Sequence, residues 1–449
     1  MILIIFRKDI LSMQFFKGGV HPYEGKDLSK DKPILKLDAG AELVFPMQQH
    51  IGAPAVPCVK KGDHVLRGQI IGEASGFVSS NILSSVSGIV KNIEPRTIDS
   101  GAKIMSVVIE NDYNYESIDG FGKKRSYENM DRQEFIEIIK NSGIVGMGGA
   151  NFPTHVKLSA DPEKIDNIIV NASECEPYLT SDYRAMLEKG TDLLGGLEII
   201  LHFFPNAKGT IAIEDNKPDA IEHMKQLAHG KARISVKTLK TKYPQGAERM
   251  LIYAVTGRKI NSKMLPADAG CIVHNVDTVS SIYRAVCEST PCISRIITVT
   301  GDAVKNPQNF IVPLGMSLSE VADAAGGFIT PPQKIISGGP MMGKSVTSLN
   351  VPVTKGTTAI LALTKDGSAE KATNCIRCGR CLKACPENLV PQKLSVLAEK
   401  RDYDEFINLN GTECVSCGCC SYVCPAKRPL AQEISAARIK SLAILKGRK

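Results

Sequence analysis

Apolar and polar positions along the middle of the chain predict helices and strands in turn. Residues 131–140 carry apolar side chains at helical spacing behind an acidic start, which predicts an amphipathic helix. The apolar run at 168–170 leads into a polar stretch, as a buried strand does where it leaves a sheet. Two further helical stretches extend to Val255 and to Val286. This alternation predicts a central α/β unit.

Strand-rich patterns flank this unit on both sides. Residues 41–95 read as short strands and turns, with glycines where hairpins need a positive φ. Beyond the α/β unit a strand begins at Ile296, a short helix covers 318–325 and a further strand covers 334–337. We therefore expect a multidomain chain that combines α/β and α+β units.

Composition supports several folded domains and no membrane span. The 449 residues leave room for about three domains of ordinary size. The longest apolar stretch, 193–204, is interrupted by glycines, Glu198 and His202, and falls short of the ~18 residues that a spanning helix needs. The first residues are apolar and the charged residues follow them, whereas in a signal peptide the charges come first. Met13 is an alternative start.

The charge of the chain does not point to nucleic acid. A net charge of +8 is modest and spread out, which disfavours nucleic-acid binding. The exception is a basic tail at 427–449, with seven Lys or Arg against Glu433. An apolar stripe runs along this tail among basic residues, so it either touches anionic lipid or a membrane subunit, or forms a solvated helix. The stripe comprises Leu430, Ile434, Ala437 and Leu445.

Glycine clusters mark two candidate phosphate loops. The cluster at 143–149 precedes a helix start, where backbone N–H groups can approach a phosphate; a tight turn explains the same residues equally well. The segment 338–345 matches the P-loop pattern up to Lys344 and Ser345. A P-loop must lead into a helix, but strand and turn sequence broken by Pro352 follows it. We therefore do not expect ATP binding there.

The strongest chemical signal is a pair of cysteine runs at 375–386 and 414–425. Both have the spacing C-x2-C-x2-C-x3-C-P of a ferredoxin with two cubane clusters, in which the fourth cysteine of each run ligates the other cluster. Structural zinc remains the alternative, although it prefers pairs of cysteines closing one tetrahedron. The rule predicts one 4Fe-4S cluster on Cys375, Cys378, Cys381 and Cys424, and a second on Cys385, Cys414, Cys417 and Cys420.

The remaining cysteines carry no such pattern. Cys419 falls outside the register of the second run, and we interpret it as a non-ligand. Most of the others read as small buried hydrophobes. Thiolate ligands require a reducing compartment.

Nearly all of the chain resembles the RnfC component of the Rnf electron-transport complex. The shared motifs are 16–22 (Phe-Lys-Gly-Gly-Val-His-Pro), the glycine loop, 338–343 and the twin cysteine runs, in that order. Residues 56–72 and 84–90 resemble the barrel sandwich of biotinyl and lipoyl carriers. No lysine lies between Glu73 and Ser87, so we expect a scaffold and no swinging arm.

The middle segment is also similar to the flavin-binding subunit of respiratory complex I. The resemblance implies non-covalent FMN held by Gly146, Gly148, Gly149, Phe152, Lys157, Asn171, Glu174, Tyr243, Asn275 and Thr278. It also implies that Phe152, Glu176 and Glu248 face NAD(H). The two glutamates are the implied catalytic residues. Met147, Ser173 and Ala247 depart from the complex I pattern, chiefly on the nucleotide side. Residues 294–343 resemble the soluble-ligand-binding β-grasp (SLBB) unit of both families, for which we favour a packing role.

The resemblance implies five segments along the chain. The segments are a barrel-sandwich hybrid at 1–125, an FMN and NADH domain at 126–292, an SLBB-like β-grasp at 293–350, a two-cluster ferredoxin domain at 362–430 and a basic tail at 431–449.

The implied protein is a peripheral subunit on the cytoplasmic side of the cell membrane. It passes electrons between NADH and an iron-sulfur subunit, membrane flavoproteins and, indirectly, ferredoxin. Two alternatives stay open: a soluble NADH-dependent reductase of the diaphorase kind, and a non-enzymatic relay whose flavin pocket is empty.

Overall fold

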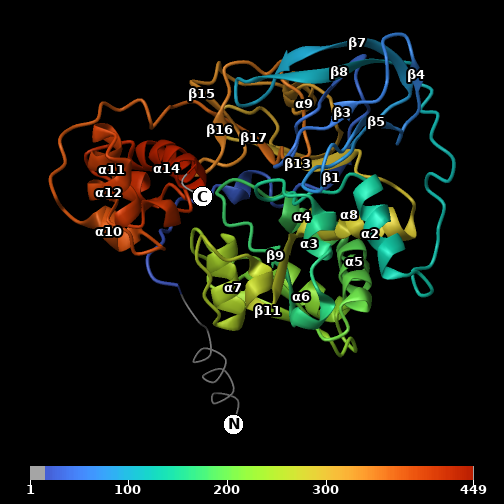
Figure 1. The fold of residues 1–449 in the computed structure, drawn as a ribbon. Coiled ribbons are helices and arrows are strands. Elements are labelled where there is room, and N and C mark those ends of the chain that lie inside the picture. The colour runs from blue at the N-terminus through green and yellow to red at the C-terminus, as the bar shows by residue number, and fades with distance from the viewer. Residues whose placement is uncertain (1–15, 448–449) are drawn as a thin grey trace.

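The computed structural model describes residues 16–447 and shows four units (Figure 1). Met1 and Met13, the two candidate start residues, and the last two residues of the basic tail lie outside this range. Within 16–447 no helix is long and apolar enough to cross a bilayer.

Two small antiparallel sheets form the N-terminal barrel sandwich. Their alternating residues point inward, so that Leu43, Phe45, Val65, Ile71 and Val107 are fully buried. One sheet has the order β2-β8-β7-β4 and the other β3-β5-β6. The strands are β2 (Glu42–Pro46), β3 (Val56–Pro57), β4 (His64–Val65), β5 (Ile70–Glu73), β6 (Ile82–Leu83), β7 (Gly88–Thr97) and β8 (Lys103–Asn111).

The connection between β5 and β6 packs against the central unit. The carbonyl of Phe77 lies 3.1 Å from His155 Nε2, and the two rings meet edge to face. In carrier domains this hairpin presents the modified lysine; here the connection makes contacts inside the molecule. The placement agrees with the scaffold role expected from the missing lysine.

The central unit is a parallel sheet with helices on both faces. The strand order is β11-β10-β9-β12, all parallel, in agreement with the predicted α/β unit. The strands are β9 (Asn167–Ala172), β10 (Lys208–Glu214), β11 (Ile234–Leu239) and β12 (Cys271–Asn275). The helices are α2 (Arg132–Asn141), α3 (Thr154–Leu158), α4 (Ser181–Glu188), α5 (Gly190–Phe203), α6 (Pro218–Leu227), α7 (Glu248–Thr256) and α8 (Val276–Cys287).

Alternate residues of this sheet face different helices. Ile169 and Val273 pack on Leu251 of α7 in one apolar cluster. Ile168 and Ile272 belong to the main core, which includes α5 and α8. These two helices approach closely because α5 has Gly196 at the crossing, where a Cβ would lie 2.0 Å from the carbonyl oxygen of Val279.

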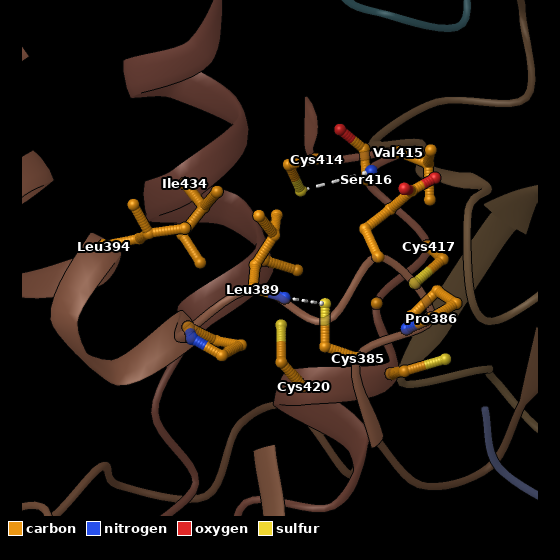
Figure 2. Close-up of a pocket in the computed structure, with 15 residues that line it drawn as sticks. Cys385, Pro386, Leu389, Leu394, Cys414, Val415, Ser416, Cys417, Cys420 and Ile434 are labelled. Atoms are coloured by element: carbon orange, nitrogen blue, oxygen red, sulfur yellow. Dashed lines mark hydrogen bonds between the residues drawn. The ribbon is translucent and has the colours of Figure 1, made fainter. Parts of the chain in front are cut away.

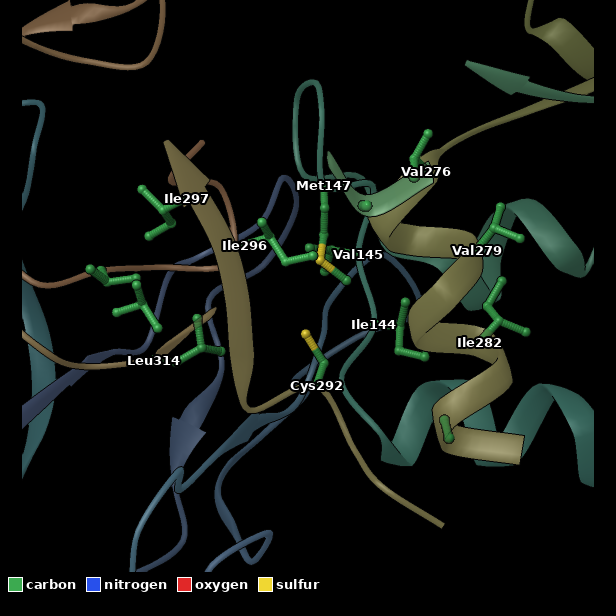
Figure 3. Close-up of a cluster of buried hydrophobic side chains, with 14 of the residues drawn as sticks. Ile144, Val145, Met147, Val276, Val279, Ile282, Cys292, Ile296, Ile297 and Leu314 are labelled. Atoms are coloured by element: carbon green, nitrogen blue, oxygen red, sulfur yellow. The ribbon is translucent and has the colours of Figure 1, made fainter. Parts of the chain in front are cut away.

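The main core continues from the central unit into the next one. Figure 3 shows Val276 and Val279 of α8 on one side, Ile144 and Met147 of the glycine loop in the middle, and Ile296 beyond them. The central and β-grasp units are therefore packed as one apolar body.

The β-grasp unit is a mixed sheet of six strands, in the order β1-β14-β13-β17-β15-β16. The elements are β1 (Ile34–Lys36), β13 (Ser294–Thr300), β14 (Gln308–Pro313), α9 (Leu318–Ala324), β15 (Lys334–Ser337), β16 (Lys344–Ser345) and β17 (Ala359–Leu363). Two of these strands lie outside the predicted segment 293–350. Strand β1 pairs with β14, and β17 lies between β13 and β15.

The segment that matched the P-loop pattern is not followed by a helix. Gly343 leads into β16, and no helix occurs between there and β17 in the described chain. Lys344 pairs with Asp99, with 3.3 Å between its Nζ and Oδ1. The missing helix agrees with the strand and turn sequence that follows this segment, and the absence of ATP binding stays a prediction.

Short helices form the C-terminal unit, which appears in Figure 1 as an orange to red lobe beside the central unit. They are α10 (Arg380–Ala384), α11 (Pro391–Lys400), α12 (Tyr403–Asn408), α13 (Cys419–Tyr422) and α14 (Leu430–Gly447), with the 3-10 turn η4 (Gly411–Glu413) between α12 and α13. The 3-10 turns η1 (Lys26–Leu28), η2 (Pro162–Lys164) and η3 (Pro266–Ala269) lie elsewhere in the chain.

The predicted apolar stripe of the tail belongs to the core of this unit. Leu430, Ile434 and Ala437 of α14 are buried with Leu394 of α11 and Phe406 of α12. Burial against other helices removes that stripe from water. These three residues are therefore available neither to lipid or a membrane subunit nor to water, which were the two alternatives for the stripe.

Candidate functional site

Polar residues gather at the carboxyl ends of β9 and β12, where parallel sheets place ligands. Asn275 Nδ2 donates to Asp182 Oδ2 at 2.6 Å. Gly148 lies against this amide, and a Cβ there would stand 2.7 Å from Asn275 Nδ2. The glycine loop therefore reaches the end of β12 only because this position lacks a side chain.

The rest of the glycine loop is fixed by hydrogen bonds on its inner side and exposed on its outer side. Thr278 Oγ1 accepts the backbone N–H of Met147 at 2.9 Å and donates to the carbonyl of Val145 at 3.1 Å. Gly146 N donates to the carbonyl of Phe152 at 2.8 Å and closes the loop. Residues 148–150 are exposed, and no atom lies within 4 Å of a Cβ built on Gly149. The loop presents bare backbone on its outer side.

Lys157 and Glu248 come together from α3 and α7. Their Nζ and Oε1 atoms are 3.3 Å apart, and Lys157 also donates to the carbonyl of Val273 at 3.0 Å. Asn171 Nδ2 donates to the carbonyl of Gly246 at 2.9 Å, which fastens the end of β9 to the turn before α7. All these predicted residues lie around one edge of the sheet.

Two buried glutamates follow β9, and a lysine from the N-terminal segment holds their loop. Lys26 Nζ donates to the carbonyls of Glu174 at 2.9 Å, Glu176 at 3.1 Å and Leu179 at 2.5 Å. Its Nζ is also 3.7 Å from Glu174 Oε2. Burial lowers the pKa of Lys26 and raises that of Glu174, while the attraction between the two opposes both shifts.

The loop of the β-grasp unit covers Glu176. Met341 N donates to Glu176 Oε2 at 3.1 Å, and a Cβ on Gly339 would lie 2.2 Å from the same oxygen. Burial raises the pKa of Glu176 to about 7. The glutamate expected on the nicotinamide side thus contacts the Gly338–Gly343 segment directly. That segment also touches the second cysteine run, since Met341 O lies 2.9 Å from a Cβ built on Gly418.

Three buried basic residues gave no signal in the sequence. Lys26 and Lys217 are nearly fully buried, and Lys217 Nζ donates to the carbonyl of Ser173 at 2.7 Å and lies 3.3 Å from Glu214 Oε2. His274 is buried one position before Asn275, and burial lowers its pKa to about 3. Lys26 and Lys217 lie outside the strands, and only their partners in the fold reveal them. His274 occupies a strand position that a period-two pattern treats as core, and only its burial reveals it.

Several buried polar atoms around this edge have no hydrogen-bond partner among residues 16–447. They are Ser173 Oγ, Glu174 Oε2, Glu176 Oε1, Tyr243 OH and both ring nitrogens of His274. Orphaned buried polar groups are costly, and groups of them are typical of a site that a polar ligand completes. The residues present therefore fit a flavin nucleotide.

Four of the predicted cluster ligands line one pocket in the C-terminal unit (Figure 2). Cys385 comes from the first run, whereas Cys414, Cys417 and Cys420 come from the second. The pocket holds about 390 Å³ of empty space, including its open mouth. The fold thus brings the last cysteine of one run to the first three of the other, as the crossed pattern requires. Cys419, which is fully buried, borders the same pocket.

The other four predicted ligands differ in their exposure. Cys375 and Cys378 are exposed, Cys381 is buried in the core formed by α11, α12 and α14, and Cys424 packs against that core. All fourteen cysteines are free thiols. Among residues 16–447 no group of three or more His, Cys, Asp or Glu is arranged around a single metal ion.

The two candidate sites meet at Tyr243. This side chain is buried with Val20, Ala384, Cys417 and Cys419 in one apolar cluster, against which Cys175 and Met341 pack. The edge of the flavin site and the four-cysteine pocket are therefore contiguous. The fold and the two sites define a flavin and iron-sulfur electron-transfer protein.

Family models match all four units. The Nuo51 FMN-binding domain matches residues 139–284, and the RnfC barrel sandwich hybrid domain matches 14–114. The SLBB domain matches 296–345, and the 4Fe-4S dicluster domain matches 374–427.

Two curated relatives match over most of their length. The C subunit of the proton-translocating ferredoxin:NAD(+) oxidoreductase complex of Clostridium ljungdahlii is 46% identical over 88% of this chain and 86% of its own. The C subunit of the Na(+)-translocating ferredoxin:NAD(+) oxidoreductase complex of Acetobacterium woodii is 45% identical over 95% of this chain and 97% of its own. The chain belongs to the RnfC family, the C subunits of the Rnf ion-translocating ferredoxin:NAD(+) oxidoreductase complexes.

A more distant relative and a solved structure show weaker likeness. The C subunit of the ion-translocating oxidoreductase complex of Vibrio cholerae is 36% identical over 87% of this chain and 51% of its own. A crystal structure of an NAD+-reducing [NiFe]-hydrogenase is 20% identical, covers 63% of this chain and 55% of its own, and has a TM-score of 0.48.

Proposed function

We propose that this chain transfers electrons between NAD(H) and the remainder of an Rnf complex. The observation that carries the proposal is the contact at Tyr243 between the edge of the central sheet and the four-cysteine pocket. Residues that fit a flavin nucleotide and residues that fit an iron-sulfur cluster share one buried boundary there. Such contact is what stepwise electron transfer requires of a protein scaffold.

We assign FMN to the open glycine loop and the strand ends around it. Gly146, Gly148, Gly149 and Lys157 would hold the phosphate side, because the loop presents bare backbone beside a lysine. The remaining positions would be lined by Phe152, Asn171, Glu174, Tyr243, Asn275 and Thr278. When bound, FMN exchanges a hydride with nicotinamide and single electrons with iron-sulfur clusters.

We assign two 4Fe-4S clusters to the crossed cysteine sets. Cys375, Cys378, Cys381 and Cys424 would hold the outer cluster, and Cys385, Cys414, Cys417 and Cys420 the inner one. The pocket of Figure 2 supports the inner set, because thiols of both runs line it together.

The chain's own residues orient and insulate these groups. Lys26 and Lys217 fix the loop that carries Ser173, Glu174 and Glu176. Glu248 is half exposed at the start of α7, so it can reach a nucleotide that approaches from solvent. Glu176 is held beneath the β-grasp loop, where it excludes water from the boundary with the cysteine pocket. We propose NAD(H) contacts for Phe152, Glu176 and Glu248.

We further propose the assembly that this role implies. The chain would be a peripheral subunit on the cytoplasmic side of the cell membrane, joined to an iron-sulfur subunit and membrane flavoproteins, with ferredoxin reached through them. The proposed division of the chain is 1–125, 126–292, 293–350, 362–430 and 431–449. The sheet of the segment 293–350 is then completed by β1 from the first segment and by β17, which begins just before the segment 362–430.

Anaerobic purification tests the proposal. We expect about eight irons and one FMN per chain, and bleaching of the flavin followed by the clusters on addition of NADH. Glu248→Gln should retain FMN and the iron-sulfur clusters. More NADH should then be needed to bleach the flavin of this variant. Eight irons without flavin, or a flavin indifferent to NADH, would contradict NADH entry through this chain and leave a relay with an empty flavin pocket.

A further inference from the structure

The two cysteine runs have the same backbone but opposite surroundings. Arg377 and Ser416 occupy the same place in each run, with φ of 57° and 55°. In both, the residue's N–H donates to the thiol two positions earlier at 3.4 Å. Gly379 and Gly418 then start α10 and α13 with φ of 74° and 79°. The runs are therefore structural repeats, and any difference between them reflects what each one faces.

The second run faces the inside of the molecule. Cys417 and Cys419 are buried with Tyr243, and Gly418 lies under Met341 of the β-grasp loop. The equivalents of Arg377, Arg380 and Lys383 in this run are Ser416, Cys419 and Tyr422, all uncharged.

The first run carries exposed basic and apolar side chains between Ile376 and Lys383. Ile376 is 68% exposed and Leu382 is 44% exposed. Arg377, Arg380 and Lys383 are exposed around them, and within residues 16–447 none of these three side chains makes an ion pair. Nearby Lys427 is already paired with Glu370 at 3.1 Å. The three cations and two apolar residues define the outer cluster face.

The three cations are not needed merely to hold a cluster. A cubane on four thiolates carries negative charge, and cations beside it raise its potential. However, the repeat that lines the inner pocket has the same backbone without them. Unpaired charges around exposed apolar side chains are instead typical of the rim and centre of a protein interface.

We propose that the outer cluster face is the docking surface for an acidic iron-sulfur domain of a partner chain, which exchanges one electron at a time with this subunit. In each transfer the donor cluster loses one electron and the acceptor cluster gains it, with no bond made or broken. The inference rests on the proposed function, and it adds the face, the charge and the kind of partner. Positive charge at the rim steers the encounter, and Ile376 and Leu382 form the dry centre.

Stopped-flow electron transfer to a probe protein tests the proposal. The probe is a small acidic plant-type 2Fe-2S ferredoxin, whose EPR signal differs from that of a cubane. The full chain with its clusters is first reduced by dithionite and freed of the excess by anaerobic gel filtration, so that electrons reach the probe only from the chain and the reaction does not depend on NADH. A failure of NADH oxidation is thereby separated from a failure of docking.

The decisive variant is Arg377→Glu, Arg380→Glu, Lys383→Glu. We expect the second-order rate at low salt to fall by at least about tenfold, and its dependence on ionic strength to flatten. At about 1 M salt, where charges are screened beyond ~3 Å, the variant and the original chain should react alike. The matched control is Lys60→Glu, Lys61→Glu, Lys124→Glu, which reverses three exposed charges on the N-terminal unit and should change neither quantity.

Three outcomes would overturn the proposal. A rate loss that persists at high salt, with a lowered midpoint potential, would show that the cations tune the cluster. An unchanged rate would show that the face is not used. Loss of binding to phosphatidylglycerol vesicles with an unchanged ferredoxin rate would assign the face to anionic lipid. Iron content and the EPR spectrum of each variant confirm that it is folded and loaded, and Arg377→Lys with Arg380→Lys should preserve the rate.

Discussion

At the scale of single residues, the role of a thiol or a carboxyl in this chain depends on where the fold places it. Cys385 belongs to the first run by sequence and lines a pocket with the second run in space. Cys419 lines the same pocket but lies outside the ligand spacing, and its Sγ is 4.0 Å from the carbonyl of Tyr243. The two cysteines should therefore respond very differently to replacement.

We predict that Cys385→Ser loses the irons of the inner cluster, so that iron falls from about eight toward four per chain. Cys419→Ser should retain about eight, because that thiol serves packing at the Tyr243 boundary. Iron and sulfide assays with EPR on the anaerobic protein measure both. Iron loss in Cys419→Ser and not in Cys385→Ser would contradict the crossed assignment.

Glu176 provides a second test at this scale. Its carboxyl has a pKa of about 7 in the folded chain because of burial, against about 4.3 when unfolded. The folded state therefore binds more protons between these values, so this group's contribution to the free energy of unfolding is full below pH ~4.3 and is lost as pH rises through ~7.

Burial raises the pKa of Asp182 to about 7 as well, so both groups contribute to a protonated carboxyl band in the infrared spectrum near pH 6. We predict that the part of this band lost between about pH 6 and pH 8 is weaker in Glu176→Gln than in the original chain. Glu248→Gln, at a half-exposed site, should leave the band unchanged. An equally strong band in Glu176→Gln would assign the proton elsewhere.

At the scale of elements, the N-terminal segment 16–29 works as a strap between units. Gly19 N donates to the carbonyl of Ala384 at 2.9 Å, and Val20 pairs with Tyr243 as an isolated bridge. Lys26 then reaches the loop after β9. The strap touches the first cysteine run, the boundary at Tyr243 and the flavin edge within a short stretch of chain.

We predict that Lys26→Met lowers the free energy of unfolding by about 3 kcal/mol, because it leaves the buried Glu174 carboxylate without its cation. Hydrogen exchange should increase in residues 173–180, which lose their donor. Lys32→Met, at an exposed position of the next turn of chain, is the matched control and should change neither. Equal protection in both variants would show that Lys26 does not hold the loop.

At the scale of the whole molecule, Lys355 joins three units. It is 0% exposed, and its Nζ donates to the carbonyl of Asn81 in the barrel sandwich at 2.5 Å and to that of Gly143 before the glycine loop at 2.6 Å. Ser80 Oγ is 3.3 Å away. Burial lowers the pKa of this lysine to about 8.

We predict that the free energy of unfolding depends on pH through Lys355 and that Lys355→Met removes this contribution. Between about pH 8 and the unfolded value of ~10.4, the unfolded chain holds this proton and the folded chain does not, so the free energy of unfolding gains from this group as pH rises. Apparent melting temperatures of the two proteins across this window measure the difference. The variant should also expose the 73–87 region to limited proteolysis, since two carbonyls lose their donor. Identical pH profiles would contradict this role.

The sequence by itself determined the features whose chemistry is local. Cysteine spacing, glycine turns and the strand ends at Asn171 and Asn275 are set within a few residues, because ligand loops and caps depend on neighbouring backbone. Motif order identified the family, and alternation predicted the α/β unit with the helices α2, α7 and α8, although it did not predict α4, α5 and α6.

Only the tertiary structure decided which distant segments meet. Lys26, Lys217 and Lys355 acquire roles from partners far along the chain, and no periodic pattern distinguishes a buried lysine from a solvated one. The apolar stripe of α14 packs inward because α11 and α12 offer it a surface. The two cysteine runs, alike in sequence, differ because packing buries Cys417 and Cys419 of the second run against Tyr243 and leaves Cys375 and Cys378 of the first run exposed.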